Sequence, residues 1–306
     1  MSRGLVGPQS PERPGPGPLP AAALRALQIQ VTRRLQGMLA GEFRSSLYGD
    51  GVELAQIRPY APGDDVRRIE WNVTARTGEP HVRVTLAERV LVTWLLLDTS
   101  PSMHFGTADR RKQDVADGVA IAVGHIATRR GNRLAVTTFG DRHPVTLPPQ
   151  QGRHGLLGLL EALRREPEEE RVGATSLGSA LTRANAIARQ RGLMVVVSDF
   201  RGPLDWRKPF IQAMSRHDVV AVEVRDPREQ ELPDVGELWL VDPETGREVR
   251  VDTRSRSLRD RFAAAAAEER SGVARVLGAL GVPHCVLSTE GDWLRPFATF
   301  LGTARR

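Results

Sequence analysis

The sequence has almost no cysteine, since Cys285 is the single one among 306 residues. One cysteine cannot form a disulfide within the chain, so a disulfide-stapled secreted scaffold and a cysteine-ligated metal site are both excluded. Cys285 lies in the apolar stretch His284–Leu287, which predicts a buried thiol.

Long hydrophobic runs are also missing. The longest strongly apolar stretch, Val90–Leu97, is far short of the roughly 20 residues that a membrane helix requires. The first twenty residues, Met1–Pro20, carry six prolines in place of the apolar core of a signal peptide. Residues 1–20 are therefore predicted to be a disordered leader, and we expect a cytoplasmic protein with no membrane span.

Runs of basic residues are absent although the chain is basic. It has 43 Lys and Arg against 37 Asp and Glu, a net charge of +6, and nearly all the cations are arginine. Basic surfaces attract the phosphates of nucleic acids. These arginines are interleaved with acids, however, and no aromatic platform accompanies them, so no nucleic-acid partner is expected.

What the sequence does contain is an alternation of apolar strands and amphipathic helices. Residues 21–88, which begin with a predicted helix at Ala21–Ala40, are expected to form an accessory segment, and residues 89–306 the main domain. The alternation predicts an α/β fold with a mostly parallel central sheet and helices on both faces. Strands are expected at Val90–Leu97, Leu134–Phe139, Leu193–Ser198, Val219–Val224 and His284–Leu287, and helices at Asp109–Arg130, Leu177–Arg191, Trp206–Arg216 and Leu258–Leu280.

A β-hairpin is predicted between the last two of these helices. Its strands are Glu237–Val241 and Glu248–Asp252, separated by the turn Pro243–Gly246. Trp206 and Trp239 both lie in periodic apolar segments, so both are expected in the core.

Polar residues stand where the predicted strands end. The first strand runs into Asp98-Thr-Ser100-Pro-Ser102, a later one into Ser198-Asp199, and a loop before a helix carries Thr175. In parallel sheets, ligands bind beyond the carboxyl ends of the strands. Carboxylates and hydroxyls are hard oxygen donors of the kind that Mg²⁺ prefers. A metal site at this sheet edge is one interpretation; an N-cap for the next helix and a hydrogen-bonded hub without metal are the others.

A second informative segment lies upstream. It reads Arg58-Pro-Tyr60-Ala-Pro-Gly63-Asp64-Asp65-Val-Arg67-Arg-Ile69-Glu-Trp71, followed by Ala75-Arg76. Pro62-Gly63 predicts a turn, an aspartate caps a short helix, and Val66, Ile69 and Trp71 are expected to point inward. The segment is interpreted either as a turn stapled by ion pairs or as a partner-docking surface formed by Arg58, Asp64, Asp65, Arg67 and Arg76. Exposed ion pairs contribute only about 0.2–1 kcal/mol each, so stability alone explains such a cluster poorly.

The strand-end residues resemble the metal-ion-dependent adhesion site of von Willebrand factor A domains, over about Glu88 to Arg306. The resemblance implies a Rossmann-like fold of that type. It implies Ser100, Ser102 and Thr175 as direct ligands of Mg²⁺ (or Mn²⁺), and Asp98 and Asp199 as ligands acting mostly through water. It further implies that an acidic side chain of a protein partner completes the metal shell.

The upstream segment, with Arg44-Ser-Ser-x-x-Gly49 before it and Glu88-Arg89 after it, resembles the bacterial domain-of-unknown-function family numbered fifty-eight, from about Arg44 to Asp252. Members of that family are commonly encoded beside MoxR-type AAA+ ATPases. The resemblance therefore implies an adaptor for such an ATPase in chaperone-like or stress-related assembly. Family members often carry an acidic residue after the site threonine; Ser176 stands there in this chain.

The alternative is an enzyme, a metal-dependent phosphatase or hydrolase that uses Asp98 as its nucleophile. Haloacid-dehalogenase-type phosphatases need a second carboxylate two residues later as general acid, and that position is Ser100. No Gly-x-Ser-x-Gly elbow and no phosphate-binding loop occur. A non-catalytic protein is therefore expected.

Overall fold

The computed structural model describes residues 54–85, 90–128, 131–141, 144–163, 176–241 and 247–303. The predicted leader 1–20 and the predicted helix Ala21–Ala40 lie outside these ranges. The chain divides into two compact units, and the boundary falls between Val90 and Leu91.

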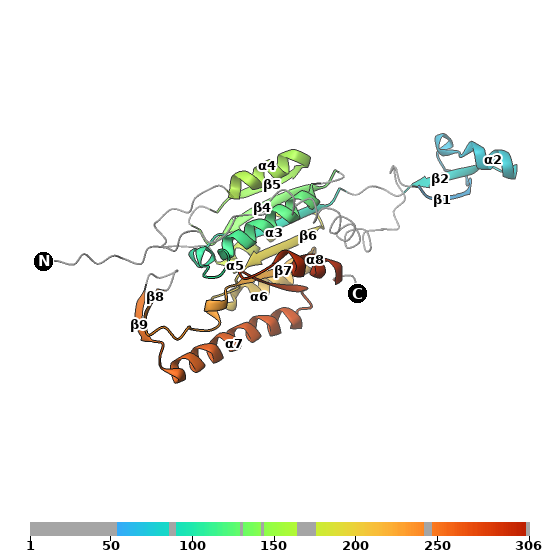
Figure 1. Cartoon of the computed structure of the whole chain (residues 1–306). Helices are drawn as coiled ribbons and strands as arrows, with labels where there is room; N and C mark the ends of the chain where they lie inside the picture. The colour runs from blue at the N-terminus through green and yellow to red at the C-terminus, as the bar shows by residue number, and fades with distance from the viewer. Residues whose placement is uncertain are drawn as a thin grey trace. The chain divides into compact units, whose positions relative to one another are not determined.

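The smaller unit pairs β1 (Leu54–Pro59) with β2 (His81–Thr85) in an antiparallel ribbon (Figure 1). Between them lie a 3-10 turn, η1 (Val66–Arg68), and α2 (Trp71–Thr77). Val82 is buried at 3% exposure, and Ile69, which bridges it, is half-buried. The prediction that Val66 and Trp71 point inward is wrong, because their exposed fractions are 60% and 69%. A two-stranded ribbon offers too little surface to cover every apolar side chain around it.

The larger unit is built on a six-stranded sheet with the order β10-β7-β6-β3-β4-β5. All neighbouring strands are parallel except β5, which is antiparallel to β4. The chain winds outward in one direction from β3 and in the other from β6, so the switch point lies between those two strands. The strands are β3 (Val92–Asp98), β4 (Arg133–Phe139), β5 (Thr146–Gln151), β6 (Leu193–Ser198), β7 (Asp218–Arg225) and β10 (His284–Ser288).

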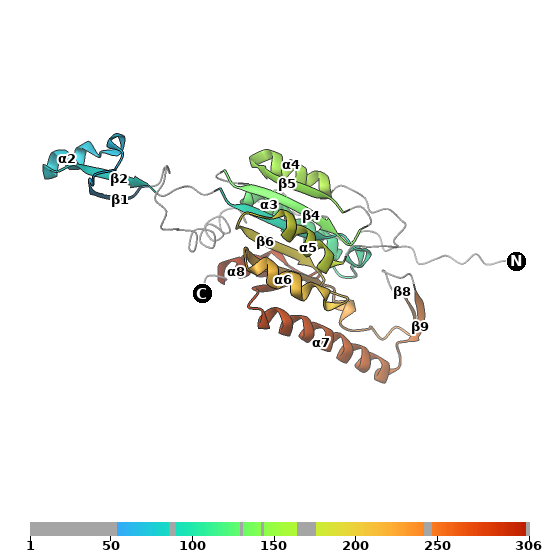
Figure 2. The ribbon, with the colours of Figure 1, turned by 180° about the vertical axis from the view of Figure 1, so that it is seen from behind.

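Helices cover both faces of this sheet (Figures 1 and 2). One face carries α3 (Lys112–Ala127), α4 (Gly152–Leu163) and α8 (Leu294–Thr303), and the other carries α5 (Leu177–Ile187), α6 (Arg207–Met214) and α7 (Arg256–Ala279). Every residue of β3 is buried, as a strand covered on both sides requires. The predicted α/β fold with a mostly parallel sheet is confirmed, and it is the architecture that a von Willebrand factor A-type fold requires.

A hydrophobic core lies between the sheet and the helices on one of its faces. Trp94 of β3 packs with Phe210 and Trp206 in the cluster beneath α5, α6 and α7. Trp206 is 2% exposed, as expected for a core residue, and Cys285 is buried as predicted. No helix within the described ranges combines the length and the apolar character needed to cross a membrane.

The predicted hairpin forms between β7 and α7, as β8 (Glu237–Val241) and β9 (Glu248–Asp252). It is a separate two-stranded sheet, and Figure 1 shows it at the amino-terminal end of α7. The expectation that Trp239 is a core residue is wrong, because its side chain is 62% exposed. The pairing places Trp239 opposite Arg250, on the more polar face of the hairpin.

Candidate functional site

The switch point between β3 and β6 holds a pair of buried polar residues. Asp98 is the last residue of β3 and is 4% exposed, while Ser198 is the last residue of β6. The Ser198 hydroxyl donates a hydrogen bond of 2.5 Å to Asp98 Oδ2, and the Ser100 N–H donates one of 2.9 Å to Oδ1. Asp98 is therefore fixed in position at the point where doubly wound sheets bind ligands.

Two serines lie beside Asp98. Ser100 directly precedes η2 (Pro101–His104), and Ser102 lies within it. Their hydroxyl oxygens are 3.0 Å apart, and each residue is 8% exposed. Ser102 also hydrogen-bonds to Asp199. The structure thus brings together four of the five predicted ligands, namely Asp98, Ser100, Ser102 and Asp199.

The fifth predicted ligand, Thr175, lies outside the described residues. Ser176, which follows it, is described and caps α5: its hydroxyl accepts the N–H of Ser179 at 3.2 Å. Ser176 is therefore the N-cap of α5. The N-cap interpretation was made for the Asp98–Ser102 stretch, where Ser100 precedes η2 but its side chain makes no capping hydrogen bond.

Gly140, which follows β4, lets the chain approach the site closely. Its φ is +86°, a left-handed conformation that favours glycine. A Cβ atom at this position would lie 2.6 Å from Ser100 Cβ and 2.8 Å from Asp98 Oδ1. Glycine is therefore required here for both conformation and space.

Asp199 is bound by a lysine that the sequence interpretation did not include. The Lys112 ammonium, at the start of α3, donates hydrogen bonds of 2.7 Å to Asp199 Oδ2 and 2.7 Å to Glu229 Oε1. The Lys112 side chain is fully buried, and Glu229 belongs to the 3-10 turn η4 (Pro227–Glu229). Lys112 is one of only two lysines in the sequence, and it shares a helical face with Val115 and Val119. That position inside an apolar stripe was the available signal.

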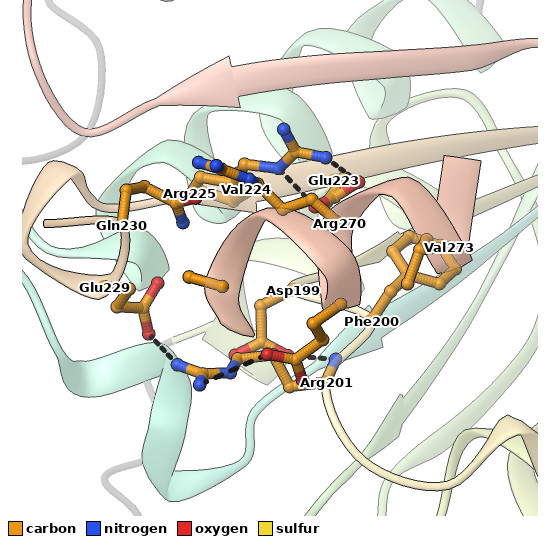
Figure 3. Close-up of a pocket in the computed structure, with 12 residues that line it drawn as sticks. Asp199, Phe200, Arg201, Glu223, Val224, Arg225, Glu229, Gln230, Arg270 and Val273 are labelled. Carbon is orange, nitrogen blue, oxygen red and sulfur yellow. Dashed lines mark hydrogen bonds and ion pairs between the residues drawn. The ribbon is translucent and has the colours of Figure 1, made fainter. Parts of the chain in front are cut away.

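Arg201 completes the charge network around Asp199. Its guanidinium donates to Glu229 Oε1 at 3.0 Å, and its backbone N–H donates to Asp199 Oδ1 at 3.1 Å (Figure 3). The two cations Lys112 and Arg201 interact with three carboxylates, those of Asp199, Glu229 and Glu269, and Asp98 is a further acid beside Asp199. Acidic groups therefore outnumber cations here, which favours a bound cation.

The two aspartates have opposite pKa shifts. Burial, together with the negative charge of Asp199, raises the pKa of Asp98 to about 7. Burial also opposes ionisation of Asp199, but the charge and hydrogen bond of Lys112 outweigh it and lower the pKa of Asp199. Asp199 is thus held as a carboxylate, and its negative charge makes ionisation of the neighbouring Asp98 less favourable.

The residue after Asp199 has a strained backbone. Phe200 has φ 54°, the one positive value among the described non-glycine residues, and its buried ring packs edge-on against Trp206 at 5.7 Å between centroids. Sparsely populated conformations of this kind cluster at functional sites. The aromatic packing holds the turn that presents Asp199.

Asp226, which follows β7, anchors the loop after the two serines. Its carboxylate accepts the Thr107 N–H at 2.8 Å, the Thr107 hydroxyl at 2.7 Å and the Thr289 hydroxyl at 2.7 Å. Asp226 is fully buried, and these bonds join the loop between η2 and α3 to the ends of β7 and β10. Sequence inspection missed this residue because nothing in its local pattern distinguishes it from a turn aspartate.

The chemistry of the donor set fits a hard divalent cation. Asp98, Ser100, Ser102 and Asp199 offer oxygen atoms alone, as Mg²⁺ prefers. No three His, Cys, Asp or Glu side chains are grouped for metal binding in the described part of the chain, so an ion here would depend on the serine hydroxyls. Both oxygens of Asp199 already accept hydrogen bonds, which suits a carboxylate that acts through water.

The upstream segment is a stapled turn. The Arg58 guanidinium binds both oxygens of Asp64, at 2.6 and 2.7 Å, and Asp64 also accepts the Ala61 N–H at 2.8 Å. Asp65 caps η1 by accepting the Arg67 N–H at 3.0 Å. The side chains of Arg67 and Arg76 are exposed. Three of the five tentative partner-binding residues thus have a structural role, and the two arginines face solvent.

A known family and a known protein resemble this chain over most of its length. The model of the family described as "Protein of unknown function DUF58" matches residues 56–272. The uncharacterized protein Rv1480 of Mycobacterium tuberculosis is 41% identical over 288 residues, which cover 94% of this chain and 90% of that protein.

Two solved structures are similar in fold. One is an aerotolerance-related membrane protein from Bacteroides fragilis (15% identity, TM-score 0.43, covering 69% of this chain and 96% of that chain). The other is a von Willebrand factor type A protein from Catenulispora acidiphila (14% identity, TM-score 0.38, covering 72% and 44%). Neither TM-score reaches 0.5, so the fold assignment depends on the strand order. By the match over residues 56–272 and the 41% identical relative, the chain belongs to the family of proteins of unknown function DUF58.

Proposed function

We propose that this protein is a non-catalytic interaction module that binds Mg²⁺ (or Mn²⁺) between β3 and β6 and uses it to bind an acidic side chain of a protein partner. The observation that carries the proposal is the convergence of Asp98, Ser100, Ser102 and Asp199, all less than 10% exposed, at the switch point. When bound, the ion supplies an open coordination position for an external carboxylate.

The residues around the proposed ion have separate roles. Ser100 and Ser102, with their oxygens 3.0 Å apart, are neutral direct ligands that leave the ion most of its charge. Asp98 and Asp199 act through water, and Lys112 keeps Asp199 from neutralising the ion by holding one of its oxygens. An incompletely neutralised ion attracts an anionic oxygen of the partner.

The proposed partner is a MoxR-type AAA+ ATPase, in chaperone-like or stress-related assembly. This choice follows from membership of the DUF58 family, because the resemblance of this chain to that family implies such a partner. The exposed arginines Arg67 and Arg76 of the smaller unit are proposed as a second contact with it.

Capture of the ATPase tests the proposal. The protein is immobilised and incubated with the MoxR-type ATPase of the same genome, in Mg²⁺ or in excess chelator. Capture is expected in Mg²⁺ and lost in chelator or with Asp98→Ala. Asp260→Ala is the matched control, because Asp260 is 71% exposed on α7. Equal capture under all these conditions would overturn the metal bridge.

The hydrolase alternative has less support from the site. Asp98 is 4% exposed, both its oxygens accept hydrogen bonds, and burial raises its pKa to about 7. A nucleophile needs an accessible, ionised carboxylate. Steady phosphoester turnover by the wild-type protein that disappears in Asp98→Asn would support the hydrolase alternative.

A further inference from the structure

The hairpin formed by β8 and β9 is an incomplete sheet. It pairs with no other strand that the structure describes, and Figure 1 shows it beside the amino-terminal end of α7. Leu238 and Leu240 lie on one of its faces. The other face exposes Trp239 at 62% and Val241 at 46%. Three or more strands with an apolar face are needed for a stable isolated sheet, so a further strand would stabilise this hairpin.

The hydrogen bonds of the hairpin show which backbone groups of β8 point away from β9. The Thr253 N–H donates to the Gly236 carbonyl at 2.7 Å, one step beyond the paired residues of the two strands. In an antiparallel pair, hydrogen-bonded residues alternate with residues whose N–H and C=O point outward. Leu238 and Leu240 are therefore bonded to β9. The outward residues are Glu237, Trp239 and Val241, and their backbone groups have no hydrogen bond to any residue within the described ranges.

The free edges of β8 and β9 differ in their protection. Proteins protect exposed strand edges with charged side chains or prolines, and the edge strand β5 of the main sheet contains Pro148 and Pro149. The outward residues of β9 are all charged and exposed; they are Glu248, Arg250 and Asp252. By contrast, β8 has one charged residue, Glu237 at its first position, and no proline. The edge of β8 is therefore the one suited to pairing with another strand.

A second copy of β8 is complementary to this edge. If two copies run antiparallel about a two-fold axis at Trp239, the two Trp239 side chains face each other. Leu238 of each copy then faces Leu240 of the other, and Glu237 faces Val241. Every outward backbone group meets an outward group of the other copy, over the full length of the strand. Aromatic and aliphatic cross-strand pairs of this kind stabilise sheets, and no like charges are opposed.

The same arrangement is unfavourable for β9. Two copies of β9 about an axis at Arg250 would place the two Arg250 side chains opposite each other. Glu248 of each copy would face Asp252 of the other. Like charges directly opposite each other destabilise a strand pair. Charge complementarity therefore selects β8 and excludes β9 as the strand that pairs with itself.

We infer that the chain forms a two-fold dimer in which the β8 strands of two copies pair antiparallel, giving a four-stranded sheet in the order β9-β8-β8-β9. The contact contains no residue of the candidate metal site. The inference therefore does not depend on the proposed function, and the dimer is expected to form without a divalent cation.

Sedimentation equilibrium of the full-length protein in excess chelator tests the inference, because chelator removes the metal as a cause of association. Val241→Pro removes an outward N–H from β8 in each copy and is expected to raise the dimer dissociation constant at least about tenfold. Glu248→Pro is the matched control, because Glu248 lies opposite Val241 and its N–H points outward from β9. That control should dimerise as wild type does. A wild-type protein that is monomeric at every concentration, or a dimer that Val241→Pro leaves unchanged, overturns the inference.

A cross-link tests the register without relying on a loss of binding. Cα atoms of a hydrogen-bonded antiparallel pair lie about 5.5 Å apart, within the range of about 4.4–6.8 Å that a disulfide spans. Trp239→Cys is therefore expected to form a covalent dimer on mild oxidation, whereas the native Cys285 is buried. Arg250→Cys is the control, because Arg250 lies opposite Trp239 in the hairpin and is 56% exposed. No covalent dimer in Trp239→Cys, or equal cross-linking in the two variants, contradicts pairing through β8.

Discussion

The Lys112 ammonium lies 2.7 Å from Asp199 Oδ2, and both side chains are almost completely buried. It lies at the same distance from Glu229, so two carboxylates share one buried cation. The positive charge of Lys112 lowers the pKa of Asp199, which explains why this carboxylate remains ionised inside the protein.

Replacing this lysine is expected to destabilise the fold. Lys112→Met removes the cation and leaves the carboxylates of Asp199 and Glu229 buried without it, a change that costs about 3–5 kcal/mol in buried pairs. Urea unfolding should show that loss, and adding Glu229→Gln should recover part of it by removing one unpaired charge. The control Arg254→Met breaks an exposed pair and should cost at most about 1 kcal/mol. A stability of Lys112→Met equal to that of the control would contradict this account.

Gly140→Ala is expected to damage the site as well as the fold. A non-glycine residue in the left-handed region costs about 1–2 kcal/mol, and the added Cβ would collide with Ser100. Gly281→Ala is the matched control, because Gly281 has φ +70° and nothing within 4 Å of the added atom. Both variants should lose stability by urea unfolding because of their positive φ, and Gly140→Ala should lose more because of the collision. Mg²⁺ affinity should fall in Gly140→Ala alone. Equal Mg²⁺ affinity in the two variants would place the ion elsewhere.

Acid should weaken the anchor at Asp226. Burial opposes its ionisation, but the hydrogen bonds from Thr107, Thr289 and Arg228 outweigh burial and lower its pKa. A carboxyl with a lowered pKa in the folded state stabilises the protein above its unfolded pKa, about 3.9, and that contribution is lost as pH falls toward the folded value. The stability gap between wild type and Asp226→Asn should therefore narrow below about pH 4 in urea titrations. A gap that stays constant with pH would show that Asp226 is not stabilising as a carboxylate.

The smaller unit allows its structural and docking roles to be separated. Arg67→Glu and Arg76→Glu change exposed side chains, so thermal melting should remain unchanged while ATPase capture falls. Arg58→Ala should instead lower the melting temperature, because it removes both bonds to Asp64. If the two Glu variants capture the ATPase as well as wild type does, this segment is not a docking surface. Its ion pair between Arg58 and Asp64 then has a structural role only.

The sequence was sufficient to predict the sheet and most of the candidate site. Continuous apolar runs in the sequence predicted β3 and β6. The rule that ligands bind at the carboxyl ends of strands then placed Asp98 next to Ser198 and Asp199. The charge network around Asp199 could not be predicted. Lys112, which binds Asp199, lies 87 positions before it, and Glu229, which binds Lys112, lies 30 positions after it, so only the packing of α3 and η4 brings them together.

The errors in the predicted core have a related cause. Periodicity marks an apolar face but does not say whether a layer covers it. Trp206 is covered by Phe200 and Phe210, whereas Trp239 and Trp71 belong to two-stranded or short elements with little to cover them. Exposure at these positions depends on tertiary context.

Binding of Mn²⁺, followed by electron paramagnetic resonance and equilibrium dialysis, tests the central claim most directly. The wild-type protein is predicted to bind one Mn²⁺ per chain, displaceable by Mg²⁺, and the Ser100→Ala/Ser102→Ala variant to bind none while keeping its near-ultraviolet circular dichroism. If the double variant binds Mn²⁺ as tightly as wild type, or if wild type binds none, the crevice between β3 and β6 is not a metal site.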